Sequence, residues 1–287
     1  MELSRRSVPN VTDDSDNGPK QHDYGAHRRS ERNGHGKEHA TRVPGIKRNW
    51  RRFRNRRACP GEAYEPTDIE HVANICTHAI SIIPAMCAMG YLLLSAPTYL
   101  HAITAVIYGC SLIALFGVST AFHSACYFGM TRRVKFTLHI CDRATIYAFI
   151  ACSYSPWLLL KDAELYVLVV FFVLWFMVFG GAVYQYLFHE KYKHFETFLY
   201  LFMGIIPGVI CVPGMADSRG IMAVAQGGAV YVLGVVFFKM DGVIPCAHAI
   251  WHLFVVVGAS WHFLAVAHYL YAGNLDIPLA AEQTIPN

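Results

Sequence analysis

The chain has 287 residues, of which 54% are hydrophobic and only 15% are charged, a more apolar composition than soluble domains usually have. Its formal net charge of +4 hides an asymmetry, because 15 of the 24 lysines and arginines precede residue 67. These values exclude an ordinary soluble domain and predict an integral membrane protein with a basic N-terminal region.

Residues 1–66 are predicted to form a disordered cytoplasmic tail. Up to about Arg42 this region has too few aliphatic residues to offset the entropy of ordering. The run KRNWRRFRNRR, residues 47–57, interleaves two aromatic residues with seven basic ones, which favours a segment lying on an anionic membrane surface. Nucleic-acid binding is the weaker interpretation, because nothing else in the chain supports it. No nucleic-acid partner is therefore expected.

Residues 67–272 are predicted to form an all-α domain, a seven-transmembrane helical bundle. Apolar runs of near-spanning length recur between short polar connections, and lipid offers backbone groups no partner outside a helix. The predicted spans are His71–Ser95, His101–Ser124, Phe136–Leu160, Glu164–Phe188, Phe195–Met215, Ile221–Phe238 and Ala247–Tyr271. A short outer tail, residues 273–287, is expected to follow them.

Basic residues in the short loops predict the orientation, because lysine and arginine favour the cytoplasmic side. If the N-terminus is cytoplasmic, the inner loops hold Arg132, Arg133, Lys135, Lys191, Lys193 and Lys239, and the outer loops hold only Lys161 and Arg219. The predicted topology thus has a cytoplasmic N-terminus and an outer C-terminus. It excludes G-protein-coupled receptors, which cross the membrane in the opposite sense.

Polar residues of three predicted spans lie at one depth, near the cytoplasmic side. His248 and His252 share one face of the seventh span, and Ser119 and His123 have the same spacing at the end of the second. Asp142 lies near the start of the third span. Ionisable residues inside a membrane are costly and are usually functional. This convergence predicts a functional site, although the histidines alone are also compatible with hydrogen bonds across the bundle or contacts with lipid headgroups.

Zinc is the metal that this residue set favours, because three imidazoles with an open fourth position are typical of catalytic zinc. His123, His248 and His252 are the predicted ligands of Zn²⁺. Asp142 is the candidate acid or base, and Ser119 is the candidate residue that orients water or a substrate carbonyl.

Five other polar residues of the spans have weaker assignments. Asn74 and His78 share a face of the first span, where hydrogen bonding between helices is favoured over metal contact. His139 is either a donor to the candidate site or an interfacial residue. Arg143 is expected to extend to the cytoplasmic surface. His262 lies toward the other end of the last span, away from this site.

These motifs resemble the progestin and adipoQ receptor (PAQR) family, which is related to bacterial hemolysin III proteins and more distantly to alkaline ceramidases. Ser119-x3-His123, Asp142 and His248-x3-His252 all match, and the resemblance covers roughly residues 60–272. Within the family the chain resembles the monocyte to macrophage differentiation factor group, through YEPTDIEHVANICTHA, CDRATIYAFIACSYSPWL, FHEKYK and GVVFFKMDGVIPCAHAIWHLFV. The resemblance implies a cytoplasmic N-terminus and zinc held by the three histidines, with Asp142 beside it.

The family pattern is not matched everywhere. In the adiponectin-receptor branch a glutamate lies three residues before the asparagine of the first span. Here that position is His71, and Glu70 precedes it. The tail before Arg42 has no counterpart in the family pattern.

Three roles agree with the sequence. The first is a zinc-containing membrane receptor or signalling modulator, responsive to a lipid or hormone in the helical cavity. The second is an enzyme, a zinc-dependent hydrolase of a lipid amide or ester inside the bilayer. The third is a scaffold with a purely structural zinc, whose basic tail recruits cytoplasmic signalling partners.

Membrane lipids are expected partners in each of these roles. A channel or transporter is disfavoured, because the polar groups cluster at one leaflet rather than across the membrane. The sequence does not distinguish between the Golgi, the endoplasmic reticulum and the plasma membrane.

Overall fold

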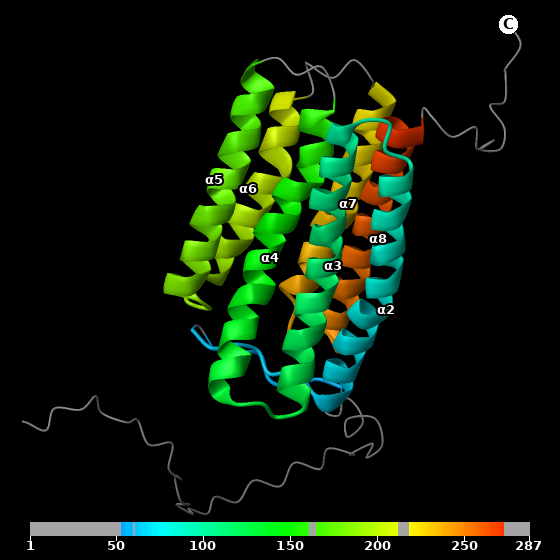
Figure 1. The fold of residues 1–287 in the computed structure, drawn as a ribbon. Helices are drawn as coiled ribbons and strands as arrows, with labels where there is room; N and C mark the ends of the chain where they lie inside the picture. The colour runs from blue at the N-terminus through cyan, green and yellow to red at the C-terminus, as the bar shows by residue number, and fades with distance from the viewer. Residues whose placement is uncertain (1–52, 60, 161–164, 212–217, 273–287) are drawn as a thin grey trace, which may run out of the picture. The chain divides into compact units, whose positions relative to one another are not determined.

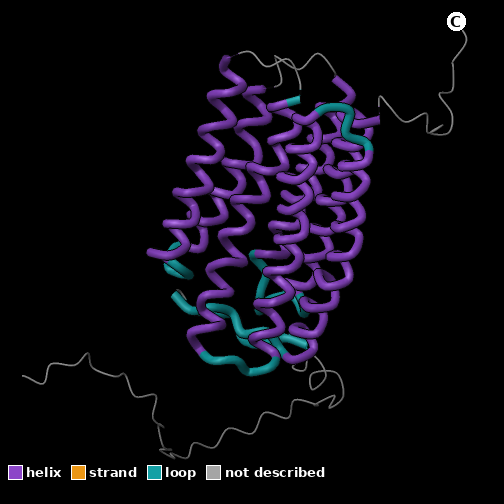
Figure 2. The backbone as a smooth tube through the Cα atoms, viewed as in Figure 1, coloured by secondary structure: helices purple, strands orange, loops and turns teal. Residues whose placement is uncertain are grey.

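The computed structural model describes residues 53–59, 61–160, 165–211 and 218–272, which all belong to the second of two units, Met1–Arg42 and Val43–Asn287. Regular secondary structure in the described ranges is entirely helical (Figures 1 and 2). It comprises α2 Asp68–Leu94, α3 Tyr99–Tyr127, α4 Arg132–Leu159, α5 Leu165–Phe188, α6 Lys193–Cys211, α7 Ser218–Phe238, α8 Ala247–Val266 and the π-helical turn η2 Ala267–Tyr271. The tail up to residue 52, Lys161 and the predicted outer tail lie outside these ranges.

Each predicted span coincides with one of the seven α-helices among the described residues. Six of them, α2, α3, α5, α6, α7 and α8 with η2, are long and apolar enough to cross a membrane. Helix α4 is as long but less apolar, because Asp142 and Arg143 lie inside it. The all-helical fold is therefore confirmed, whereas the seven-span count and the orientation stay predictions.

Threonine side chains begin three of the helices. Thr67, Thr98 and Thr131 are the N-caps of α2, α3 and α4, and each accepts a hydrogen bond from a backbone N–H of the first turn. Such caps satisfy N–H groups that have no partner within the helix. Helices α2 and α4 consequently begin three or four residues before the apolar runs that the sequence predicted as spans.

Helices that follow one another in the chain pack together, and α8 closes the arrangement by also contacting α2 and α4. One cluster of buried hydrophobic residues includes Leu112 and Phe149, and a second includes Leu174 and Met203. The outer face of α5 exposes large apolar side chains, among them Phe172, Phe176 and Phe179. An outward-facing apolar surface of this kind is what a membrane-spanning helix presents to lipid.

Candidate metal centre

The three predicted zinc ligands lie together. His123 of α3 and His248 and His252 of α8 each offer one ring nitrogen within 4.8 Å of the others. The ring of His123 is centred 5.3 Å from that of His248 and 5.1 Å from that of His252. His123 and His252 are only 2% exposed. The four-residue spacing on α8 and the packing of α3 near it thus bring the imidazoles to one point.

Hydrogen-bond partners of two of these rings fit a metal-binding role. His252 Nδ1 lies 3.3 Å from the backbone oxygen of Asn74. His248 Nδ1 lies 3.3 Å from Asp241 Oδ2. An acceptor at Nδ1 holds the proton there and leaves Nε2 with a free electron pair for a metal ion. Metal-binding histidines commonly have such a carboxylate or carbonyl partner.

His123 is the third member, and its Nε2 is buried without a hydrogen-bond partner among the described residues. Its Nδ1 lies 3.4 Å from the Asn74 side-chain nitrogen, while the amide oxygen of Asn74 is buried and unpaired. A half-turn of the amide group places the oxygen at His123 Nδ1 and leaves Nε2 free for a metal. The three ring nitrogens therefore fit the coordination of one metal ion by three histidines. The hydrogen bond expected between Asn74 and another helix is confirmed.

A cavity of about 720 Å³ extends from His248 and His252 between α3, α4, α6, α7 and α8. Ser119, Asp142, His248 and His252 line its histidine end, and most of its other walls are apolar. The hydroxyl of Ser119 is buried and lies beside the Asp142 carboxylate. Every residue predicted for the site thus lies in the three-histidine cluster or in the cavity wall beside it.

The family described as Haemolysin-III related matches residues 69–263, which include all three histidines. This chain belongs to the haemolysin-III-related family. It is 45% identical over 232 residues to the monocyte to macrophage differentiation factor of Homo sapiens, covering 80% of this chain and 97% of that protein.

Bacterial relatives are also similar. The hemolysin-3 homolog of Bacillus subtilis is 32% identical over 207 residues, covering 70% of this chain and 94% of the relative. The hemolysin-3 of Bacillus cereus is 30% identical over 206 residues, covering 70% and 92%. The resemblance drawn from the motifs is confirmed. Together with the six apolar helices, it makes this haemolysin-III-related protein a multi-pass integral membrane protein.

Glu70 supports the start of α8, a role that the sequence did not suggest. Helix α8 begins after Cys246, whose backbone is left-handed at φ 53° and whose side chain caps nothing. The fully buried Glu70 carboxylate accepts from the backbone N–H of His248 at 3.4 Å and from the Tyr64 hydroxyl at 3.0 Å. Burial and the nearby Glu70 carboxylate raise the pKa of Tyr64, so its hydroxyl stays a donor. A carboxylate at a helix N-terminus is stabilising.

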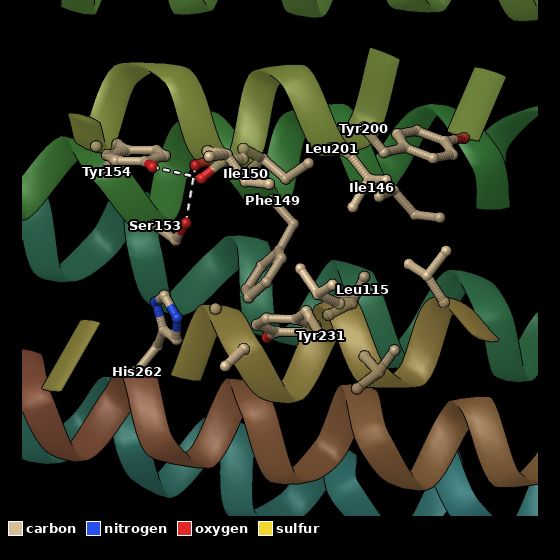
Figure 3. A pocket seen from close by; sticks show the side chains of 18 of the residues that line it. Leu115, Ile146, Phe149, Ile150, Ser153, Tyr154, Tyr200, Leu201, Tyr231 and His262 are labelled. Carbon is tan, nitrogen blue, oxygen red and sulfur yellow. Dashed lines mark hydrogen bonds between the residues drawn. The ribbon is translucent and has the colours of Figure 1, made fainter. Parts of the chain in front are cut away.

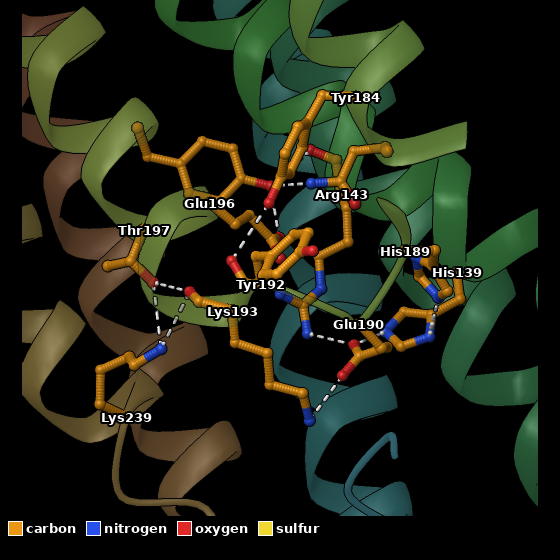
Figure 4. Close-up of polar contacts among 12 residues, drawn as sticks. His139, Arg143, Tyr184, His189, Glu190, Tyr192, Lys193, Glu196, Thr197 and Lys239 are labelled. Atoms are coloured by element: carbon orange, nitrogen blue, oxygen red, sulfur yellow. Dashed lines mark hydrogen bonds and ion pairs between the residues drawn. The ribbon is translucent and has the colours of Figure 1, made fainter. Parts of the chain in front are cut away.

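Arg143 does not extend to the surface, so that expectation is wrong. Its side chain is 12% exposed and donates to Glu196 Oε1 at 2.7 Å and to Glu190 Oε1 at 3.1 Å (Figure 4). Its guanidinium also lies 5.0 Å from the centre of the Phe238 ring. Glu190 and Glu196 neutralise the guanidinium charge inside the protein, so the Arg143 side chain does not need hydration by bulk water.

His139 belongs to a second cluster that the sequence did not predict. Its Nδ1 lies 3.0 Å from His189 Nε2, and its Nε2 lies 3.5 Å from Glu190 Oε1. One atom from each of these three residues lies within 4.8 Å of the others. Burial alone would raise the pKa of Glu190, but the charges of Arg143 and Lys193 outweigh it and hold that pKa below its usual value. Because these cations already neutralise Glu190, this cluster is a poorer site for a metal than the three histidines.

His78 is another residue whose role the structure corrects. Its ring stacks on that of His252 at 3.7 Å with an interplanar angle of 11°. Both of its ring nitrogens are buried without a hydrogen-bond partner among the described residues. The expected hydrogen bond between helices is therefore wrong for His78, which packs against a candidate ligand instead.

Proposed function

We propose that this haemolysin-III-related protein binds one zinc ion through His123, His248 and His252, and hydrolyses the amide or ester bond of a lipid held in the cavity. The observation that carries the proposal is the three-histidine cluster beside a largely apolar cavity, whose wall includes His248, His252, Ser119 and Asp142. Apolar walls suit an acyl chain, and the polar end suits the bond to be cleaved.

The residues of the polar end divide the chemical work. When bound, zinc supplies Lewis acidity, which polarises a carbonyl group and makes water more acidic. Ser119, whose hydroxyl lies beside Asp142, donates a hydrogen bond to the carbonyl oxygen. Asp142 accepts a proton as water adds to the carbonyl carbon, and it passes that proton to the leaving nitrogen or oxygen when the bond to carbon breaks. The apolar walls exclude bulk water.

The cavity walls favour a lipid as the substrate. Ile205 and Val209 of α6 and Val232 and Leu233 of α7 line the cavity and are also exposed on the outer surface. A cavity whose wall side chains also face outward between two helices is accessible to a molecule dissolved in the bilayer. Membrane lipids are therefore the source of the substrate in this proposal.

We further infer seven spans, with the N-terminus cytoplasmic and the C-terminus outside. Helix α4 contacts α3, α5, α6 and α8, so it crosses the membrane with them. Its internal Arg143 is ion-paired, which lowers the cost of placing it at membrane depth. The proposed organisation is a cytoplasmic tail of residues 1–66, a membrane domain of residues 67–272 and an outer tail of residues 273–287.

A receptor or signalling modulator is the second candidate, and one contact favours it. Arg143 lines the cavity and also holds Glu190 in the turn between α5 and α6. A lipid or hormone that displaces the Arg143 side chain would move the α5–α6 turn, and a signalling partner bound to that turn would respond to the change. The scaffold hypothesis depends on the basic tail, which lies almost wholly outside the described residues.

Turnover tests the proposal directly. Zinc-loaded full-length protein in lipid nanodiscs is incubated with a panel of lipid amides and esters, and the products are measured by mass spectrometry. Asp142→Asn should abolish hydrolysis, and Asp68→Asn, at an exposed carboxylate, should not. Unchanged turnover in Asp142→Asn would remove its proton-transfer role. Saturable lipid binding without any product would favour the receptor over the hydrolase.

A further inference from the structure

We propose that the cavity has a second polar binding point, formed by the Tyr231 hydroxyl and His262 Nε2, which binds a neutral oxygen near the tail of the lipid. The group bound there is a hydroxyl or a carbonyl. The inference deepens the proposed function, because it names the class of ligand that the same cavity binds. It rests on that function only in placing the head group of the lipid at the three histidines.

Both groups line the cavity, and Figure 3 shows their rings among its wall side chains. The ring centres lie 5.6 Å apart. Tyr231 Oη and His262 Nε2 are each buried without a hydrogen-bond partner among the described residues. Two polar side chains near them in the wall are satisfied, because Tyr154 donates to the Gly204 oxygen at 2.6 Å and Ser153 to the Ile150 oxygen at 2.8 Å (Figure 3). Two neighbouring unpaired groups on residues that line one cavity indicate a missing partner.

Close helix packing fixes both rings. A Cβ atom at Gly258 of α8 would lie 2.8 Å from Tyr231 Cε2, and one at Gly227 of α7 would lie 2.3 Å from His262 Cδ2. Each ring is thus seated against a glycine of the opposite helix, where no other side chain would fit without a shift. The polar atoms are held by the fold and are not free to turn toward other partners.

The spacing along α8 defines the length of the ligand. His262 follows His248 by 14 residues on this helix, or ~21 Å along its axis at ~1.5 Å per residue. Half of the hydrocarbon core of a bilayer is only about 15 Å thick. A ligand that reaches both ends is therefore an elongated amphiphile. Its distal polar group is neutral, because an unpaired charge in this apolar cavity would lose its hydration without compensation.

Binding of two matched probes tests the inference. Hexadecanamide and its ω-hydroxy derivative are titrated onto full-length protein in nanodiscs, and tryptophan fluorescence reports binding because Trp157 and Trp251 line the cavity. The wild type should bind the hydroxylated probe about tenfold more tightly, as expected for a hydrogen bond made in a dry site. Tyr231→Phe keeps the ring and should reduce this ratio to about one, and His262→Leu should reduce it too.

Tyr147→Phe is the matched control, because it removes a buried phenol hydroxyl whose ring packs against Gly181 of α5 and does not line the cavity. This variant should keep the tenfold preference. The inference is overturned if the wild type does not discriminate, if neither probe binds, or if Tyr231→Phe retains the full preference. The result for His262→Leu counts only if this variant folds. If it does not fold, Tyr231→Phe alone tests the binding point.

The zinc proposal is judged separately. In His248→Ala/His252→Ala the metal content should fall, while the preference for the hydroxylated probe should persist, since the tail-binding residues are untouched. Loss of that preference together with zinc would contradict an independent binding point.

Discussion

Asp241 is predicted to strengthen zinc binding without contacting the metal. Its Oδ2 lies 3.3 Å from His248 Nδ1, and the side chain is 21% exposed. The carboxylate orients the imidazole and holds the proton on Nδ1, so that Nε2 remains a donor to the metal. Removal of such a partner typically weakens metal binding about 10- to 100-fold.

Two substitutions separate the charge of Asp241 from its hydrogen bond. Asp241→Asn keeps an oxygen acceptor but no charge, so the zinc dissociation constant should rise by about tenfold, at the lower end of this range. Asp241→Ala removes both and should approach about 100-fold. Asp68→Asn is the control, because it removes the charge of an exposed carboxylate in the first turn of α2.

The assay is zinc competition between the purified full-length protein and a fluorescent chelator, with thermal unfolding measured on each variant to establish folding. The reasoning is refuted if folded Asp241→Ala binds zinc as tightly as the wild type. It is also refuted if Asp68→Asn weakens zinc binding as much as Asp241→Asn does, because the effect would then come from the net charge of the protein and not from the contact with His248.

Three further predictions concern stability. Arg143→Met should lower the free energy of unfolding by about 3–5 kcal/mol, because it leaves the buried Glu196 carboxylate without an ion-pair partner. Glu190→Gln should cost less, since Glu196 still pairs with Arg143, and equal losses in thermal unfolding would contradict this order. Because the pKa of Glu190 is lowered, its ionised form should stabilise the folded protein fully above the ordinary pKa of glutamate, and this contribution should be lost as the pH falls through the lowered value. The melting temperature of the wild type should therefore fall more in acid than that of Glu190→Gln, and an identical fall in the two proteins would contradict this. Glu70→Ala should destabilise the protein by about 1–2 kcal/mol through loss of the α8 cap, whereas exposed Glu65→Ala should not; equal melting temperatures for these two variants would exclude a capping role.

The helices were predictable because apolar run length determines where a chain can cross a membrane. The first residues of the helices were less predictable. The span predicted to begin at Phe136 begins at Arg132 in the structure, after the N-cap Thr131. A cap is a local hydrogen bond, and hydropathy does not record it. The convergence of His123 with His248 was also predictable, since spans of alternating direction bring the end of one to the depth of the start of another.

The supporting contacts of the site were not predictable, because one joins residues far apart in the chain and the other depends on how the turn before α8 folds. Asp241 lies in a turn and Glu70 at the start of α2, and only the packed structure places both beside His248. Arg143 was predicted wrongly for a related reason. The expectation that it extends to water assumes no carboxylate within reach, whereas Glu190 of the α5–α6 turn and Glu196 of α6 both pair with it.

Metal content of the purified full-length protein is the most direct test of the central claim. The account predicts about one zinc per chain in the wild type, its loss in His248→Ala/His252→Ala, and its retention in His139→Ala/His189→Ala, which disrupts the second cluster. A folded wild type without zinc, or zinc that is lost from the His139/His189 variant and kept in the other, would contradict the assignment of the metal to His123, His248 and His252.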